Sequence, residues 1–415
     1  MRRPLSLLAT AVLLAGLAAL DLAGAPPAGA LNQITTFTAA GMGSPDSVTA
    51  GPDGNIWFAS SNGDKIGKVT PSGTVTVFPQ DPSYGPNDIV AGPDGNLWFT
   101  ARQASAIGKI TPSGTVTLYT NANINRPQAI TAGPDGNLWF TSHDNDRIGK
   151  ITTAGAITVF PVNANVDGPY GITAGGDGNL WFTSSSNNRI GRITTTGVIT
   201  TFANATHVRL PLGITSGPDG ALWYANSANS SLGRISTAGA FSSFLGVSGA
   251  TDVVAGPDGN LWVSEGNQHR IARVTTAGAV ATFANANLEF PQGIAVGPDK
   301  NIWFASQGNG RVGRLTTPKC DGQVATVLVG AYGLPSGAGD VIVGTAGRDV
   351  INGDLGNDRI CGRGGNDTPR GQGGNDTLNG AGGNDTLNGG DQTDTCIGGP
   401  GTNTLTKCEA VPAGP

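Results

Sequence analysis

The sequence predicts an all-β protein built from two repeat domains, a seven-bladed β-propeller followed by a parallel β-roll. Two periods carry this prediction. Tryptophans recur every 39 to 42 residues in the long first part, and aspartates recur every nine residues near the C-terminus. Units of about 40 residues with short strands and tight turns are typical of propeller blades, whereas glycine-rich nonapeptides are typical of parallel β-rolls. The tryptophans are Trp57, Trp98, Trp139, Trp181, Trp223, Trp262 and Trp303.

Residues 1–30 have the pattern of a secretory signal peptide. Two arginines follow Met1, an apolar run extends from Leu5 to Leu20, and small residues precede a predicted mature start at Leu31. The apolar run is too short to cross a bilayer comfortably, and no later stretch approaches the required length. We therefore expect a secreted, extracellular product without a membrane span.

The charge of the chain is unevenly distributed. The formal net charge is −5, and the part from Lys319 onward holds 6 basic and 11 acidic residues. The first part is nearly neutral and poor in lysine, which argues against a nucleic-acid partner. The acidic C-terminal part indicates an affinity for cations.

All four cysteines lie in the C-terminal part. An even number of cysteines in an exported protein favours disulfides over metal thiolates. Three pairings are possible, and the sequence alone does not decide among them. We favour Cys320 with Cys361 and Cys396 with Cys408.

Each unit of about 40 residues predicts four strands. Alternation of apolar and polar residues, as in residues 74–78, indicates half-buried strands. The string Pro52-Asp53-Gly54-Asn55 predicts a hairpin turn between the first and second strands, because proline presets one torsion angle and glycine accepts a positive one. Since this string recurs in nearly every unit, we interpret its aspartates as turn residues rather than catalytic carboxylates. We interpret the tryptophans as packing wedges between sheets.

The seventh unit lacks its fourth strand. After Leu315 the chain runs into Pro318, but a matching stretch is found at the other end, in residues 33–37. We expect this N-terminal stretch to pair as the outer strand of the last blade and to close the ring, which removes open sheet edges. The predicted domains are the propeller at 31–317, a linker at 318–334, the roll at 335–409 and a tail at 410–415.

The nine-residue period predicts a calcium-binding roll. Its copies, such as residues 371–379, fit G-G-x-G-x-D-x-U-x, where U is apolar. Calcium prefers six to eight oxygen ligands, and glycine-rich turns let carbonyls approach the ion while aspartate supplies charge. So thin a core cannot hold itself together against repelling carboxylates, so we expect the roll to fold only with calcium. The candidate metal ligands are Asp340, Asp349, Asp358, Asp367, Asp376, Asp385 and Asp394.

This region, roughly residues 335–406, resembles the haemolysin-type (RTX) calcium-binding repeat. The resemblance implies an ion between one turn and the turn two repeats on. Asp358 would then share a site with the turn of Asp376, and Asp367 with that of Asp385. Pro369 occupies an apolar position and Asn403 replaces the next aspartate, so we expect fewer ions than repeats.

The blade motif, P-x-G-I-T before GPDG and W-F-T-x after it, is similar to that of the streptogramin (virginiamycin B) lyase family across residues 31–317. The resemblance implies a seven-bladed propeller. It also implies enzymes that open a cyclic depsipeptide by elimination, with magnesium held by glutamates and a histidine as general base. The histidine would follow proline in P-H-G-I-T, one glutamate would lie two residues before it, and another would close W-F-T-E.

This chain fills those positions differently. The histidine position holds Asp46, Asn87, Gln128, Tyr170, Leu212, Thr251 and Gln292. The position two residues earlier contains no glutamate, and the W-F-T-E position contains one, Glu265. Glu265 and His269 share the sixth unit, where a carboxylate could orient an imidazole for proton abstraction, but we favour a solvated loop pair.

Two functions remain in view. The first is a secreted, calcium-stabilised binding or scaffold protein that presents its propeller face to an unknown protein, peptide or carbohydrate. The second is a lyase of the streptogramin type, which would need magnesium, or another propeller activity such as lactone hydrolysis. An ordered divalent ion beside Glu265 and a histidine near the axis would favour the enzyme. A channel mouth lined by Ser, Asn, Gln and Tyr would favour binding. A purely structural role at the cell surface is a third reading.

Overall fold

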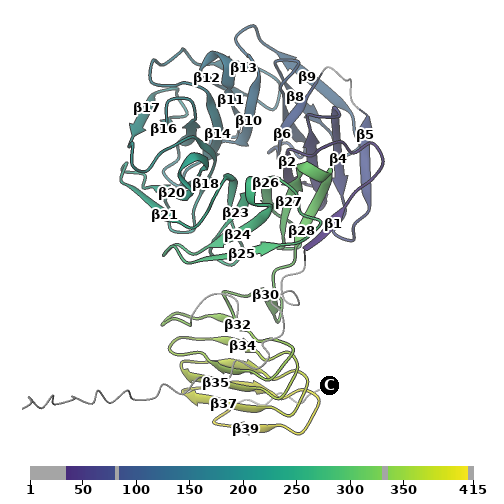
Figure 1. The fold of residues 1–415 in the computed structure, drawn as a ribbon, viewed down its shortest axis with the longest axis vertical. Coiled ribbons are helices and arrows are strands. Elements are labelled where there is room, and N and C mark those ends of the chain that lie inside the picture. Colours follow the sequence, from purple (N-terminus) through teal and green to yellow (C-terminus); the bar gives the residue numbers. More distant parts are fainter. Residues whose placement is uncertain (1–33, 80–83, 330–334, 410–415) are drawn as a thin grey trace, which may run out of the picture.

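The computed structural model describes residues 34–79, 84–329 and 335–409, and Figure 1 shows their arrangement. Within these ranges, seven four-stranded antiparallel sheets form a ring, and a parallel β-roll lies beyond it. The predicted all-β architecture of propeller and roll is therefore confirmed. The predicted signal peptide 1–30 and the tail 410–415 lie outside the described residues. No helix in the described part of the chain is long and apolar enough to cross a membrane.

The innermost strands line the channel of the ring. They are β2 (Ser47–Ala50), β6 (Pro86–Ala91), β10 (Pro127–Ala132), β14 (Pro169–Ala174), β18 (Pro211–Ser216), β22 (Ala250–Ala255) and β26 (Pro291–Val296). The second strands carry the tryptophans and are fully buried. They are β3 (Ile56–Ser60), β7 (Leu97–Ala101), β11 (Leu138–Ser142), β15 (Leu180–Ser184), β19 (Leu222–Asn226), β23 (Leu261–Glu265) and β27 (Ile302–Ser306).

The third and outer strands complete each blade. The third strands are β4 (Lys65–Val69), β8 (Ala106–Ile110), β12 (Arg147–Ile151), β16 (Arg189–Ile193), β20 (Ser231–Ile235), β24 (Arg270–Val274) and β28 (Arg311–Leu315). The outer strands are β5 (Val75–Pro79), β9 (Val116–Thr120), β13 (Ile157–Val159), β17 (Ile199–Ala203), β21 (Phe241–Leu245), β25 (Val280–Ala284) and β1 (Ile34–Phe37). Short 3-10 turns follow four second strands, at η2 (His143–Asn145), η3 (Ser227–Asn229), η4 (Gly266–Gln268) and η5 (Gln307–Asn309).

The ring is closed by the N-terminal strand, as predicted. Strand β1 pairs antiparallel with β28, with Ile34 opposite Leu315 and Phe37 opposite Val312. Blade seven is therefore assembled from both ends of the propeller sequence. This pairing fixes the first blade against the last and leaves the ring without a gap.

The repeated turn aspartate is a structural residue in every blade. In blade one, Asp53 Oδ1 accepts a hydrogen bond of 2.9 Å from Trp57 Nε1, and Oδ2 lies 2.9 Å from Lys68 Nζ. Gly54 has φ of +76°, so it supplies the left-handed conformation that the turn requires. The aspartate thus fixes the turn and satisfies the buried indole N–H at once, which confirms the turn interpretation.

The tryptophans pack between blades, as expected. Trp57 is fully buried and shares a core cluster with Leu97 and Phe99 of blade two. On its own blade it stacks on Phe78, with ring centroids 5.3 Å apart. Equivalent stacks occur in all seven blades at 5.0 to 5.5 Å. Burial of these large rings is the main apolar contribution to holding neighbouring sheets together.

The C-terminal roll consists of two parallel sheets. One contains β31 (Val327–Leu328), β32 (Val341–Val343), β34 (Arg359–Cys361), β36 (Thr377–Asn379) and β38 (Thr395–Ile397). The other contains β33 (Val350–Asn352), β35 (Thr368–Gly373), β37 (Thr386–Asp391) and β39 (Thr404–Thr406). Apart from the pair β31–β32, partners within a sheet lie 18 residues apart, as Ile360 and Leu378 do, so two nonapeptides make one turn of the roll.

The apolar core of the roll is small and is formed by residues of both sheets. Leu378 and Leu387, at predicted apolar positions, are fully buried. Gly374 shows how tightly the turns stack: its φ is +135°, and a Cβ there would lie 1.8 Å from the carbonyl oxygen of Gly356. Only glycine fits this position.

The segment predicted as a linker is partly ordered. Residues 319–328 form β29 (Lys319–Cys320), β30 (Gln323–Val324) and β31, and β31 joins the first sheet of the roll. Residues 330–334 lie outside the described residues. The difference arises because the sequence of this segment lacks both repeat periods, whereas pairing with β32 and a disulfide give it partners in the fold.

Both favoured disulfides are present. Cys320 is bonded to Cys361, and Cys396 to Cys408. The first joins the segment after the propeller to the roll. Beside it, Phe283 of blade six packs on the apolar cluster that contains both of its cysteines. The disulfide thus fixes residue 320 to the roll, and apolar packing holds the start of the roll against blade six.

Candidate functional site

The aspartates of the roll stack in two columns. From Asp358 onward, the Oδ1 of each aspartate accepts a hydrogen bond of 2.8 Å from the backbone N–H of the aspartate 18 residues earlier, as Asp376 Oδ1 does from Asp358. The backbone N–H of Asp367 donates the same bond to Asp385 Oδ1. The turns that the RTX resemblance pairs are therefore direct neighbours in the roll. At the end of the columns, the side chains of Asn403 and Glu409 take the place of the next aspartate. The sequence period had identified Asn403, but Glu409 lies outside the period.

The second carboxylate oxygen of five aspartates is buried without a hydrogen-bond partner among the described residues. These aspartates are Asp358, Asp367, Asp376, Asp385 and Asp394, each at most 2% exposed. A buried anionic oxygen without a donor is costly, so a cation is the group that such a site lacks. Hard carboxylate oxygens in glycine-rich turns fit calcium, and these five residues would hold it.

Asp340 and Asp349 differ from the other five. Asp340 Oδ2 accepts hydrogen bonds from the backbone N–H and the hydroxyl of Ser336, and Asp349 Oδ2 accepts the same pair from Thr345. The assignment of Asp340 and Asp349 as metal ligands therefore stays a prediction, and in these two turns a hydroxyl already satisfies the oxygen that the other turns leave unpaired. In all five of those other turns the corresponding residue has positive φ, at Asp354, Arg363, Gln372, Ala381 and Gly390.

The electrostatics of the columns also favour a cation. Burial, together with the charges of Asp376 and Asp340, raises the pKa of Asp358 to about 6. Burial and the charges of Asp349 and Asp385 likewise raise the pKa of Asp367 to about 6. Neighbouring carboxylates in low dielectric repel one another, and a divalent cation between them removes that penalty.

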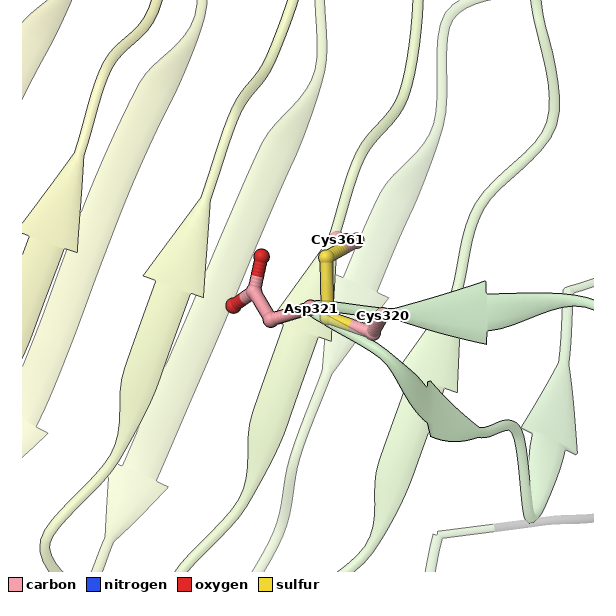
Figure 2. Close-up of side chains that lie close together, drawn as sticks. All are labelled: Cys320, Asp321 and Cys361. Carbon is pink, nitrogen blue, oxygen red and sulfur yellow. A yellow bond between two sulfur atoms is a disulfide. The ribbon is translucent and has the colours of Figure 1, made fainter.

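A second cluster resembles a metal site only by composition. Cys320, Asp321 and Cys361 lie close together, as Figure 2 shows. Both sulfur atoms are used in the disulfide, and Asp321 lies 3.0 Å from Arg359 in an ion pair. This cluster therefore secures the start of the roll and offers no thiolate to a metal.

The other candidate site is the channel of the propeller. It is a cavity of about 650 Å³, lined by the innermost strands of all seven blades. Its lining residues include Asn87, Gln128, Tyr170, Thr251 and Gln292, which stand at the histidine position of the lyase motif. The cavity is polar, and none of the three histidines lines it.

Asp46 also occupies the histidine position, but its oxygens are already used. Ser61 donates to Oδ2 through its N–H at 2.7 Å and its hydroxyl at 2.6 Å, while Gln307 donates to Oδ1. Burial raises the pKa of Asp46. It is therefore a hydrogen-bond acceptor that Ser61 and Gln307 hold in place in the channel lining.

Glu265 does not form the expected pair with His269. Its side chain is fully buried rather than solvated, and it accepts hydrogen bonds from the backbone of Ser248 and from Arg270. His269 Nδ1 instead accepts the N–H of Phe290 at 2.9 Å. A carboxylate held in an ion pair away from the channel cannot orient an imidazole there.

Two carboxylates in the channel had been missed. Asp88 and Asp252 follow the histidine position by one residue, where the other blades carry serine, alanine or glycine. A comparison of that position across the blades would have found them. Asp88 accepts hydrogen bonds from Ser47 Oγ at 2.6 Å and from Ile130 N–H in blade three at 2.8 Å.

Comparison with known families decides what the propeller is related to. The model of the virginiamycin B lyase family matches residues 32–246 and 245–349, which together cover most of the chain. The chain belongs to the virginiamycin B lyase family. The RTX calcium-binding nonapeptide repeat matches residues 336–369 and 370–405, which indicates that the roll binds calcium.

Solved structures agree with this assignment. A streptogramin B lyase is 32% identical, with 69% of this chain and 98% of that chain covered and a TM-score of 0.65. A catalytically inactive virginiamycin B lyase from Staphylococcus aureus, solved with quinupristin, is 31% identical over 69% of this chain and 100% of its own, with a TM-score of 0.64. The WD40 propeller domain of Doa1 shares the fold alone, at 12% identity and a TM-score of 0.58, covering 69% of this chain and 97% of its own. No curated protein matches the chain.

Proposed function

We propose that this member of the virginiamycin B lyase family is a secreted binding protein, in which the propeller channel receives a ligand and the calcium-loaded roll stabilises the mature chain outside the cell. The observation that carries the proposal is the composition of the channel lining. Amide, hydroxyl and phenol groups stand where the lyase motif places its histidine, and Glu265 is held in an ion pair with Arg270.

The chemistry of elimination supports this distinction. Proton abstraction requires a base within hydrogen-bond reach of the substrate, and the channel presents no imidazole among its lining residues. Magnesium belongs only to the lyase alternative, for which the W-F-T-E position supplies a single glutamate. Binding requires only a shaped cavity with a few polar groups, and a volume of about 650 Å³ is in the range of small-ligand sites.

The roll supports the proposed location. External calcium is far more abundant than intracellular calcium, so the stacked aspartates would repel one another during export and fold around the ion afterwards. Disulfides such as Cys320–Cys361 persist in oxidising surroundings. The leader-like residues 1–30 supply a route to that compartment.

A turnover assay tests the proposal. The mature protein is incubated with quinupristin and magnesium, and ring opening is followed by mass spectrometry beside an active virginiamycin B lyase. We expect no ring-opened product above the uncatalysed background. Turnover that disappears on removal of magnesium would overturn the proposal in favour of the lyase. Export is tested separately, by the N-terminal sequence of the protein recovered from the culture medium, which should begin at Leu31.

A further inference from the structure

The channel carries an uncompensated negative charge. Its charged lining residues are Asp46, Asp88, Asp252 and Arg102, so the cavity has two more negative than positive groups when all are ionised. The positive charge of Arg102 favours the ionised form of Asp46 and partly offsets the rise in pKa that burial causes. Asp88 and Asp252 have no ion-pair partner among the described residues. The excess charge therefore resides on these two carboxylates.

Both carboxylates clamp neighbouring blades together. Asp252 accepts hydrogen bonds from Val253 N–H at 2.9 Å and from Ile294 N–H of blade seven at 3.2 Å. Asp88 holds blade three in the same way through Ile130. These inter-blade hydrogen bonds explain why hydrogen-bond acceptors occupy positions 88 and 252, but they do not compensate the negative charge of the two carboxylates. Two half-buried anions that repel each other lower the stability of the fold unless a cation joins them.

The groups around Asp252 add to this penalty. Burial, reinforced by the charge of Asp88, raises the pKa of Asp252 to about 7. Tyr170 faces the same space, and its pKa is raised by burial and by the charges of Asp252 and Asp46. Apart from Arg102, no positive group lines this part of the described structure.

An independent observation concerns Gln128. This side chain lines the channel from blade three and is only 5% exposed, yet its Oε1 has no hydrogen-bond partner among the described residues. A buried amide oxygen in a native protein almost always accepts a hydrogen bond. The Gln128 side chain has a hydrogen bond with the Tyr170 phenol, but its Oε1 accepts none, so a ligand with N–H groups would satisfy that atom.

Geometry distinguishes an organic cation from a metal ion. No three acidic, cysteine or histidine side chains of the described channel lie close enough together to share an ion. The channel carboxylates are instead spread over blades one, two and six, while blade four contributes the ring of Tyr170. A metal ion needs several oxygen ligands in one place. An ammonium group needs only a neighbouring carboxylate and a hydrogen-bond acceptor, and the apolar body attached to it can extend across the channel.

We propose that the channel binds an organic cation in which an ammonium group is joined to an apolar or aromatic part, with Asp88 and Asp252 as charge partners and Gln128 Oε1 as a hydrogen-bond acceptor. Tyr170 would contact the apolar part or lie against the cation. This inference rests on the proposed binding function and names the class of its ligand.

The test uses 2-phenylethylammonium as the probe and neutral phenylacetamide as its matched comparison. Both are titrated into the calcium-loaded, full-length mature protein at pH 8 and followed by ligand-observed NMR. We expect saturable binding of the ammonium compound with a dissociation constant on the order of 1 mM or tighter, and binding of phenylacetamide at least about tenfold weaker. This comparison needs no variant. Equal affinities, or no binding of the ammonium compound, would overturn the inference.

Variants locate the site. The double variant Asp88→Asn/Asp252→Asn should bind the ammonium compound at least about tenfold more weakly, because it removes both charges. Asp94→Asn changes a turn aspartate outside the cavity and should bind like the unaltered protein. Unchanged binding in a folded double variant, judged by circular dichroism, would refute the assignment to these carboxylates. Turnover of quinupristin would instead refute the proposed function, so the two failures are distinguishable.

Discussion

Removal of calcium should unfold the roll while the propeller stays folded. Five buried carboxylate oxygens have no partner among the described residues. An unpaired buried polar atom costs about 1 to 3 kcal/mol, so together the five would cost about 5 to 15 kcal/mol without the ion. That is the size of the whole stability of a typical domain, about 5 to 15 kcal/mol. The small apolar core of the roll cannot offset such a cost.

The assay combines circular dichroism with limited proteolysis, in calcium and in excess chelator. We expect loss of β-signal and rapid cleavage within residues 335–409 after chelation, with the propeller region protected. A roll that keeps its spectrum and its protease resistance in chelator would refute the reasoning.

A pair of variants makes the test specific. Asp376 belongs to two neighbouring turn pairs and has a free Oδ2, so Asp376→Asn should raise the calcium concentration for half-folding at least about tenfold. Asp340 Oδ2 is satisfied by Ser336, so Asp340→Asn should change that concentration by about twofold or less. Equal shifts in the two variants would show that the hydroxyl turns do not differ from the others.

Arg273 and Asp258 form an ion pair that is buried where blade six meets the roll. The Arg273 guanidinium also donates a hydrogen bond to the carbonyl oxygen of Thr326, beyond the propeller. Arg273→Met should lower the free energy of unfolding by about 3 to 5 kcal/mol in denaturant titrations. Arg234→Met, which breaks the partly exposed pair with Asp219 in blade five, should lower it by about 1 kcal/mol or less. Similar losses in the two variants would contradict the role of burial. Replacing Cys320 and Cys361 with alanine removes a crosslink over 41 residues. It should cost the roll about 4 kcal/mol, seen as a higher calcium midpoint of folding, and an unchanged midpoint would contradict this expectation. The pKa of Asp252 is raised from 3.8 to about 7, so its ionisation destabilises the fold as the pH rises through this range. Relative to Asp252→Asn, the unaltered protein should lose up to about 4 kcal/mol of stability between pH 4 and pH 8, and parallel pH profiles would contradict the shift.

Periodicity is why so much of the fold could be predicted. A unit of about 40 residues must bury its tryptophan against the next unit, so seven tryptophans predict seven blades. The missing fourth strand of the last unit and its match at residues 33–37 predicted the closure that β1 and β28 make. The nine-residue period likewise predicted the stacking of Asp358 on Asp376, because residues 18 apart occupy equivalent places in successive turns.

The chemistry of individual sites was less predictable. The pattern of aspartates did not show that Ser336 and Thr345 satisfy two of them, because that depends on the local turn conformation. The blade motif likewise did not show that Glu265 is buried in an ion pair, since its partner Arg270 is identified only by strand pairing.

The sequence by itself determined the two repeat architectures, their order and the type of metal that the roll binds, because repeated spacing dictates repeated geometry. Only the tertiary structure decided which carboxylates remain without a partner. Asp88 and Asp252 are 164 positions apart in the chain numbering, and the ring brings them into one channel. Charge compensation depends on distance through space, which a linear pattern does not contain.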